Sequence, residues 1–227
     1  MTTFMLVHGA WHGPWAWDRV VPLLEAAGAR TLTVDLTGDH GLHDHAALVI
    51  AALDGVQEEV VLVGHSYGGL VVREAADARP GSVRHIVLVD GWAGPDGASM
   101  FSLAPATFVK AVSTLAEASE DGRWIPAPPP AAYGITDAGD AEWLAPRLVP
   151  QPLRTFAEST RLTGAVDLIP GTAVYCTPPS YPYDRLGASA GYRTLPVPGP
   201  HDVMLTDPEP LARMLLDAAQ EQQETVQ

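Results

Sequence analysis

Short runs of apolar and β-branched residues alternate along the chain with longer stretches whose apolar positions recur every three to four residues. The short runs predict buried strands, and the longer stretches predict helices. Regular alternation of the two is typical of a mostly parallel sheet with helices on both faces. The pattern predicts strands at 4–8, 31–36, 59–64, 85–90, 172–176 and 192–197, and helices at 17–27, 45–53, 70–78 and from 208 onward.

The alternation is lost between residues 92 and 166, where proline, alanine and glycine are abundant. We interpret 92–166 as a lid inserted into one α/β core that is formed by 1–91 and 167–227. The lid is expected to form a few short helices over the site. Apolar lid side chains are expected to face the cleft, among them Phe101, Leu103, Phe108, Trp124 and Trp143.

Composition narrows the classes of function. A chain of 227 residues is long enough for one full hydrophobic core. Its net charge of −14 argues against binding to nucleic acid or to anionic membranes. The single cysteine, Cys176, excludes an internal disulfide, and the start of the chain lacks the pattern of a secretion signal. We therefore expect a cytoplasmic protein with a small-molecule substrate; a homodimer stays open.

The strongest chemical signal is the segment 64–69, Gly-His-Ser-Tyr-Gly-Gly, which lies between a predicted strand and a predicted helix. Serine in a G-x-S-x-G pattern at such a turn is typical of a nucleophile elbow, in which the turn exposes the serine hydroxyl above the sheet. The alternative is a glycine-rich turn with an ordinary serine. The flanking elements favour Ser66 as a nucleophile.

Two further segments complete this chemistry. His8-Gly9-Ala10 follows the first strand, and an oxyanion hole needs two converging backbone N–H groups. We expect those of Ala10 and of Tyr67, the residue after the serine. His201 lies in a loop between the last strand and the last helix, where the general base comes in chain order. A surface histidine without function is the alternative for His201.

Other residues allow two interpretations. The histidines and aspartates of 39–45 could ligate zinc, but their order is H-x-x-H-D-H and no distal ligands are evident, so we favour a polar loop that leads into a helix. No metal and no cofactor are therefore expected. Trp11 and Trp92 are expected to bind substrate, as Tyr67 could also do, with plain core packing as the alternative for each.

With these residues the chain resembles the plant methyl esterase and hydroxynitrile lyase branch of the α/β-hydrolases. The resemblance lies in 6–28, in 34–36, in 64–69 and in 201–208, and covers 4–91 and 171–216 without the lid. It implies the α/β-hydrolase fold, with Ser66 as nucleophile, His201 as base, and Ala10 and Tyr67 as oxyanion donors. Related bacterial sequences often act as esterases or in natural-product pathways.

The chain departs from that family at the triad acid. The family places it in a Cys-Thr-acid-Asp pattern, where this chain has Cys-Thr-Pro178-Pro179. Asp90, at the end of the strand after the elbow helix, is the expected replacement, because that strand end points to the same rim as Ser66. Asp184 is the alternative, and Asp202 is too close to His201 in sequence. Asp90 could instead only cap the turn at Gly91.

The expected activity is hydrolysis of a small to medium ester, lactone or thioester through an acyl-enzyme. Two alternatives stay open: a natural-product lyase or cyclase that uses Ser66 and His201 for proton transfer, and a binding protein without catalysis. The family's hydroxynitrile lyases carry a lysine next to the catalytic histidine. Asp202 holds that position here, and Lys110 is the chain's one lysine, which disfavours release of cyanide.

Overall fold

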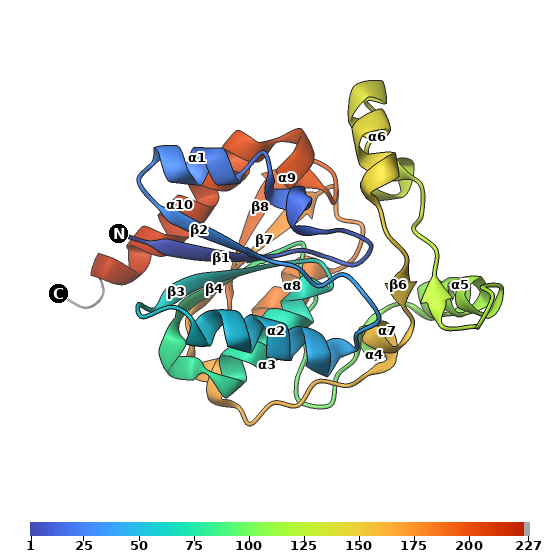
Figure 1. Ribbon diagram of the computed structural model, residues 1–227. Helices are drawn as coiled ribbons and strands as arrows, with labels where there is room; N and C mark the ends of the chain where they lie inside the picture. The colour runs from blue at the N-terminus through green and yellow to red at the C-terminus, as the bar shows by residue number, and fades with distance from the viewer. Residues whose placement is uncertain (225–227) are drawn as a thin grey trace.

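A computed structural model describes residues 1–224, with side chains through residue 220. Six parallel strands form a single twisted sheet in the order β2-β1-β3-β4-β7-β8 (Figure 1). Apolar residues fill the central strands, so β1 and β3 are buried along their whole length. The strands are β1 (Thr3–Val7), β2 (Arg30–Val34), β3 (Val60–His65), β4 (Val83–Val89), β7 (Gly171–Thr177) and β8 (Arg193–Pro198).

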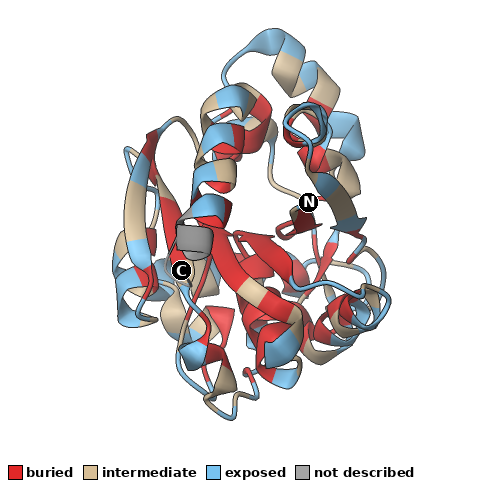
Figure 2. Ribbon diagram, turned by 90° about the vertical axis from the view of Figure 1, so that its left-hand side faces the viewer, coloured by how far each residue is buried: buried red, intermediate tan, exposed pale blue. Residues whose placement is uncertain are grey.

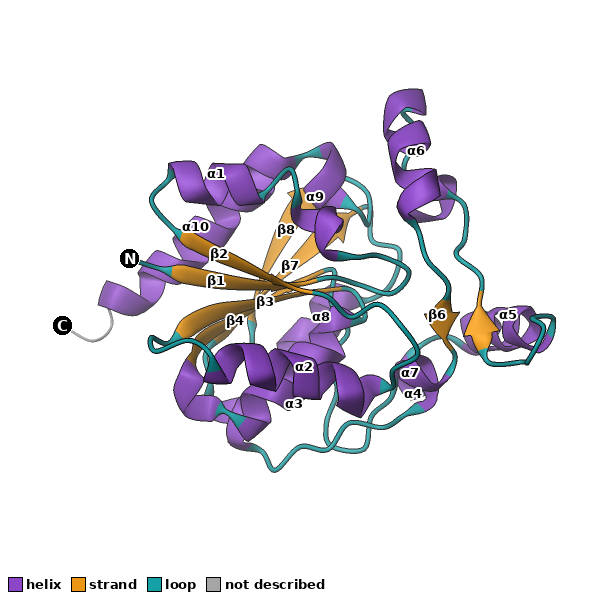
Figure 3. Ribbon diagram, viewed as in Figure 1, coloured by secondary structure: helices purple, strands orange, loops and turns teal. Residues whose placement is uncertain are grey.

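Helices cover both faces of this sheet (Figure 3). On one face lie α1 (Val21–Ala26), α9 (Val203–Thr206) and α10 (Pro208–Glu224). On the other lie α2 (Leu42–Asp54), α3 (Gly68–Ala78) and α8 (Tyr183–Ser189). Figure 2 shows the buried strands between these exposed helix surfaces. The α/β-hydrolase fold and the parallel sheet predicted from the sequence are confirmed.

The helix expected at 17–27 is wrong in its first part. A short 3-10 helix occupies Pro14–Trp17, and α1 begins only at Val21. Pro22 explains this start, because proline lacks the N–H of a helix interior but fits the first turn. Helix α8 was not expected, since its seven residues follow a proline-rich loop and are too few for a clear period.

The segment between β4 and β7 lies beyond the ends of the strands (Figure 1). It forms the short helices α4 (Met100–Leu103), α5 (Ala106–Glu117), α6 (Ala138–Leu144) and α7 (Arg154–Ala157). Its two short strands, β5 (Trp124–Ile125) and β6 (Gln151–Pro152), pair antiparallel with each other and add nothing to the main sheet. We keep the name lid for residues 92–166.

The expectation for the apolar lid residues is wrong for four of the five. Phe108 lines the cavity beside Ser66, whereas Phe101, Leu103, Trp124 and Trp143 do not. Phe101 packs edge-on against Phe156 within the lid, and Trp143 packs against Trp15 and under Arg147. Phe101 therefore buries apolar surface within the lid and Trp143 does so between lid and core, and composition alone does not distinguish either position from the lining of a cleft. No helix in the described part of the chain could cross a membrane.

Candidate active site

Ser66 occupies the sharp turn between β3 and α3, as expected for a nucleophile elbow. Its φ of 51° lies in the left-handed region, which is strained for a residue with a side chain. Glycines permit the tight turn: a Cβ on Gly64 would lie 2.7 Å from the Gly68 carbonyl oxygen, and one on Gly68 would lie 2.7 Å from that of His8. The Ser66 N–H donates to the Val89 carbonyl at 3.1 Å, which holds the turn against β4.

Asp90 meets His201 at the carboxyl end of the sheet. Asp90 Oδ2 accepts a hydrogen bond from His201 Nδ1 at 2.8 Å, and Asp90 Oδ1 accepts one from the Cys176 N–H at 2.7 Å. The Asp90 side chain is fully buried, while 15% of the His201 side chain is exposed. Both carboxylate oxygens of Asp90 therefore bond to residues other than Gly91, so Asp90 does not merely cap the turn at Gly91. Asp184 lies in α8 and makes no such contact with His201 among the described residues.

Two rings hold the His201 imidazole in place. Tyr183 stacks on it at a centroid distance of 5.6 Å and an angle of 14°, and His65 lies 4.7 Å away. Burial holds the pKa of Tyr183 well above its usual range. Burial also lowers the pKa of His65 well below its usual range, so His65 is neutral and its Nε2–H donates to the His201 carbonyl at 3.1 Å.

The loop after β1 carries the first expected oxyanion donor. Leu36 N–H donates to His8 Nε2 at 2.9 Å, so His8 Nδ1 holds the proton and donates it to the Gly9 carbonyl at 2.8 Å. This hydrogen bond to the Gly9 carbonyl fixes the orientation of the Gly9–Ala10 peptide, which carries the Ala10 N–H. Within the described chain, neither the Ala10 N–H nor the Tyr67 N–H has a protein acceptor, so both can donate to a bound oxyanion.

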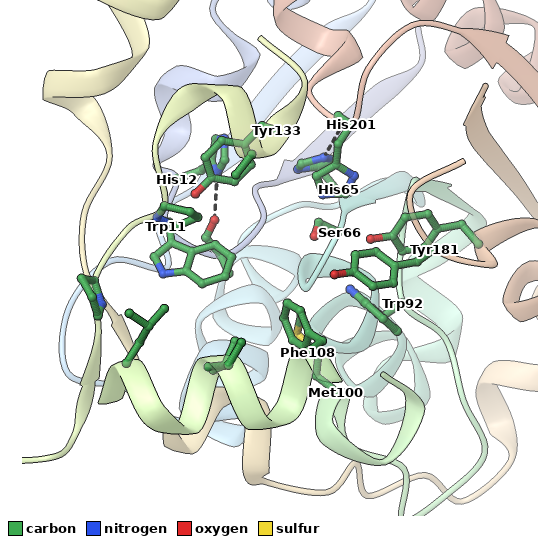
Figure 4. Close-up of a pocket in the computed structure, with 18 residues that line it drawn as sticks. Trp11, His12, His65, Ser66, Trp92, Met100, Phe108, Tyr133, Tyr181 and His201 are labelled. Atoms are coloured by element: carbon green, nitrogen blue, oxygen red, sulfur yellow. Dashed lines mark hydrogen bonds between the residues drawn. The ribbon is translucent and has the colours of Figure 1, made fainter. Parts of the chain in front are cut away.

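Ser66 and His201 line one cavity of about 280 Å³ whose walls are mainly aromatic and apolar. Figure 4 shows Ser66 at its centre, with Trp11, His12 and Tyr133 on one side and Trp92 and Tyr181 on the other. Trp11 and Trp92 thus lie where substrate contact was expected. The Tyr67 ring does not line the cavity but packs against His45 and Phe156. The remaining lining residues are Ala10, His65, Met100, Phe108, Ala111, Val112, Leu115, Pro126, Pro128, Ala132 and Tyr183.

A family model described as the alpha/beta hydrolase family matches residues 4–214. The chain belongs to the α/β-hydrolase family. A carbendazim-hydrolysing esterase from a Nocardioides species is 30% identical over 95% of this chain and 98% of the relative. An α-hydroxynitrile lyase of Arabidopsis thaliana is 34% identical over 39% of either chain, so the plant likeness covers less than half of each protein.

Solved structures show the same hydrolase fold. An extracellular α/β-hydrolase from a Paenibacillus species superposes with a TM-score of 0.86 at 23% identity, over 96% of this chain and 99% of that one. A pyrethroid hydrolase from Sphingobium faniae gives a TM-score of 0.78 at 21% identity. The resemblance predicted from the sequence is confirmed at the level of the family.

Hydrogen bonds from Trp11 join the lid to the loop of residues 8–12, which we call the oxyanion loop. The Trp11 N–H donates to Gln151 Oε1 at 3.0 Å and its indole N–H donates to the Ile125 carbonyl at 3.2 Å. The Val149 N–H donates to the Trp11 carbonyl at 2.9 Å. Trp11 has a φ of 64°, a conformation that costs about 1–3 kcal/mol in a residue other than glycine. The three lid bonds stabilise it.

The histidines of 39–45 do not gather around a common point. His43 Nδ1 pairs with Glu74 at 2.6 Å, and His45 Nδ1 bonds to the Tyr67 hydroxyl at 2.9 Å. Asp44 accepts the Gly41 N–H at 2.8 Å, as a polar loop leading into a helix requires. Elsewhere His65, His201 and Asp202 offer ligand atoms within 4.8 Å of one another. Of these three residues, His201 already uses its Nδ1 in the hydrogen bond to Asp90.

Sequence reasoning missed several residues of the site. Tyr181 and Tyr183 follow the two prolines that replace the family acid, so the loop that elsewhere supplies a carboxylate supplies two aromatic rings here. His12 lines the cavity and bonds to Asp202, although 190 positions separate the two residues. The two histidines of the 8–12 segment were visible in the sequence, but nothing local identified Asp202 as the partner of His12.

Proposed function

We propose that this protein is a serine hydrolase that cleaves a small to medium carboxylic ester, lactone or thioester through an acyl-enzyme on Ser66. The observation that carries the proposal is the 2.8 Å contact between Asp90 and His201 Nδ1 beside a serine in a strained strand-to-helix turn. A nucleophile, a base and a group that orients the base are the parts that acyl transfer requires.

The Asp90 contact sets the chemistry of His201. Because the carboxylate accepts the Nδ1–H, the neutral ring leaves Nε2 unprotonated, and this nitrogen takes the proton from Ser66 as the oxygen attacks. The buried carboxylate then stabilises the imidazolium that forms. His201 returns the proton to the leaving group, and a water activated by the same nitrogen releases the acyl group.

The oxyanion that forms on the substrate carbonyl accepts hydrogen bonds from Ala10 N–H and Tyr67 N–H. Each donor of this kind contributes about 10²–10³ to kcat, because it is fixed before the charge develops. Tyr67 lies at the start of α3, so the N-terminal end of the helix dipole adds to this stabilisation.

The cavity favours a compact and largely apolar substrate. About 280 Å³ of space with mainly aromatic walls suits a small aryl or short acyl group. Carbendazim, which the Nocardioides relative hydrolyses, is therefore one compound to assay beside simple esters.

Asp90 also removes the reason to favour a binding protein without catalysis, because the proline-for-acid change no longer leaves His201 without a carboxylate. A cytoplasmic location remains our prediction from the single cysteine, whereas the Paenibacillus relative is described as extracellular. Neither location alters the chemistry proposed for the site.

The test combines a fluorophosphonate probe with a panel of p-nitrophenyl esters. We expect labelling of the wild-type protein and rapid release of p-nitrophenol from short esters, with both lost in Ser66→Ala. Labelling and ester cleavage that persist in Ser66→Ala would place the nucleophile elsewhere. A wild-type protein that neither labels nor cleaves any ester of the panel would refute the proposed function.

A further inference from the structure

A second histidine–carboxylate pair lies beside the one formed by His201 and Asp90. His12 Nε2 and Asp202 Oδ2 are 3.0 Å apart, and their side chains are 1% and 0% exposed. The other ring nitrogen, His12 Nδ1, lies 2.7 Å from the Ala10 carbonyl oxygen. Asp202 directly follows His201, and His12 lies two residues after Ala10. The pair therefore joins the loop of the base to the loop of the oxyanion donor.

These two hydrogen bonds require a protonated His12. Both partners are acceptors, and a neutral imidazole carries only one N–H, so a neutral ring could serve only one of them. Burial by itself lowers the pKa of His12, but the charge of Asp202 and the two hydrogen bonds outweigh burial and raise it. A ring with both nitrogens engaged cannot accept the proton of Ser66, which excludes His12 as an alternative base.

The Ala10–Trp11 peptide is held from both sides. His12 engages its carbonyl oxygen, and Gln151 of the lid accepts its N–H at 3.0 Å. This peptide follows the Ala10 N–H directly and precedes Trp11, whose φ of 64° is strained, so the His12 bond and the lid bonds together stabilise this part of the loop. Loss of the His12 bond would free the carbonyl and allow the peptide to rotate.

We propose that His12 and Asp202 are positioning residues that fix the oxyanion loop against the loop of His201. The proposal rests on the proposed serine hydrolase activity. The pair touches no reacting atom. It holds the Ala10 N–H at the point where charge develops, so its loss should weaken binding of the transition state more than binding of the substrate.

The test compares Asp202→Asn with the wild-type protein and with His43→Gln. Asparagine keeps the shape of Asp202 but removes the charge that holds the proton on His12. His43→Gln is the matched control, because it replaces the histidine of a histidine–carboxylate contact of 2.6 Å to Glu74 outside the cavity. The double variant His12→Phe/Asp202→Leu removes both polar groups together and leaves no unpaired buried charge if Asp202→Asn fails to fold.

In Asp202→Asn, kcat for p-nitrophenyl acetate should fall about 10–100-fold, which is less than the loss of a whole oxyanion donor, while KM changes less than about threefold. The inhibition constant of a boronic acid, which forms a tetrahedral adduct on serine, should rise by a similar factor. His43→Gln should match the wild type in both. Wild-type kcat and boronate affinity in Asp202→Asn, or a loss carried by KM alone, would overturn the proposal.

Nuclear magnetic resonance separates this proposal from the proposed function. The titratable groups that face His12 are Asp202, His65 and Tyr133, and burial keeps His65 and Tyr133 uncharged. The wild type should show two low-field imidazole N–H signals from His12, and Asp202→Asn should lose at least one and shift the Ala10 and Trp11 amide signals. Unshifted amide signals would refute the positioning role even if the protein cleaved no ester.

Discussion

Replacing Asp90 with asparagine should disable His201 by reversing one hydrogen bond. Asp90 Oδ1 accepts the buried Cys176 N–H at 2.7 Å, so the asparagine must keep its oxygen on that side. Its NH₂ group then faces His201 Nδ1 in place of Oδ2, which now lies 2.8 Å from that nitrogen. A donor facing Nδ1 forces the proton to Nε2, and a protonated Nε2 cannot take the proton of Ser66.

The magnitude follows from the number of interactions lost. The substitution removes the correct tautomer and the carboxylate that stabilises the imidazolium, and amide substitution of a triad acid elsewhere costs about 10⁴ in kcat. We expect a loss of about 10²–10⁴ in kcat here, which corresponds to about 3–5 kcal/mol of transition-state stabilisation. The fold should be retained, because asparagine has nearly the shape of aspartate.

The assay is the steady-state hydrolysis of p-nitrophenyl acetate, with circular dichroism as a check of the fold. Asp184→Asn is the matched control, since it makes the same chemical change in α8 without a contact to His201. We expect Asp184→Asn to retain wild-type kcat within about twofold. Wild-type kcat in Asp90→Asn would show that His201 works without a buried carboxylate, and loss in Asp184→Asn alone would reverse the assignment.

Three further outcomes are expected. Mandelonitrile should release no cyanide above background, because both nitrogens of His12 are engaged and Asp202 stands where the lyases have lysine; measurable cyanide would contradict this. Phe108→Ala should raise the kcat/KM of p-nitrophenyl hexanoate relative to acetate about tenfold by widening the cavity, and an unchanged ratio would argue against Phe108 as an acyl contact. Asp77→Ala should lower the free energy of unfolding at neutral pH by about 2–4 kcal/mol, because the carboxylate accepts the N–H groups of Thr163, Gly164 and Val166. Burial raises the pKa of Asp77, but these hydrogen bonds outweigh burial and lower the pKa. The difference in unfolding free energy between Asp77→Ala and wild type, measured by urea unfolding, should therefore shrink as the pH falls through the folded-state pKa of Asp77. A difference that stays constant with pH would contradict this.

Local chemistry explains which parts of the site the sequence could predict. The strand, glycine pattern and helix around Ser66 specify a turn by sterics alone, so both its position and its conformation followed from neighbouring residues. Asp90 followed from topology, because parallel strands β3 and β4 end at the same rim. The structure brings Asp90 to His201 across 111 positions. The prediction needed only one change, a carboxylate at the end of β4 in place of the family acid after β7.

Contacts between distant loops could not be predicted in the same way. The pair of His12 and Asp202 depends on how two loops approach each other across the rim, and neither residue carries a local signal for its partner. The lid shows the same limit. Phe108 and Trp143 are both apolar lid residues, yet one lines the cavity and the other packs on Trp15. Periodicity reports that a side chain is buried, and tertiary packing decides where.

An acyl group trapped on Ser66 is the most direct test of the account. Wild-type protein mixed with p-nitrophenyl acetate and quenched in acid within the first turnovers should gain the mass of one acetyl group, and peptide mapping should place it on Ser66. Ser66→Ala treated in the same way should gain none. Ester cleavage by the wild type without any covalent acetyl intermediate, or an acetyl group on another residue, would contradict the account.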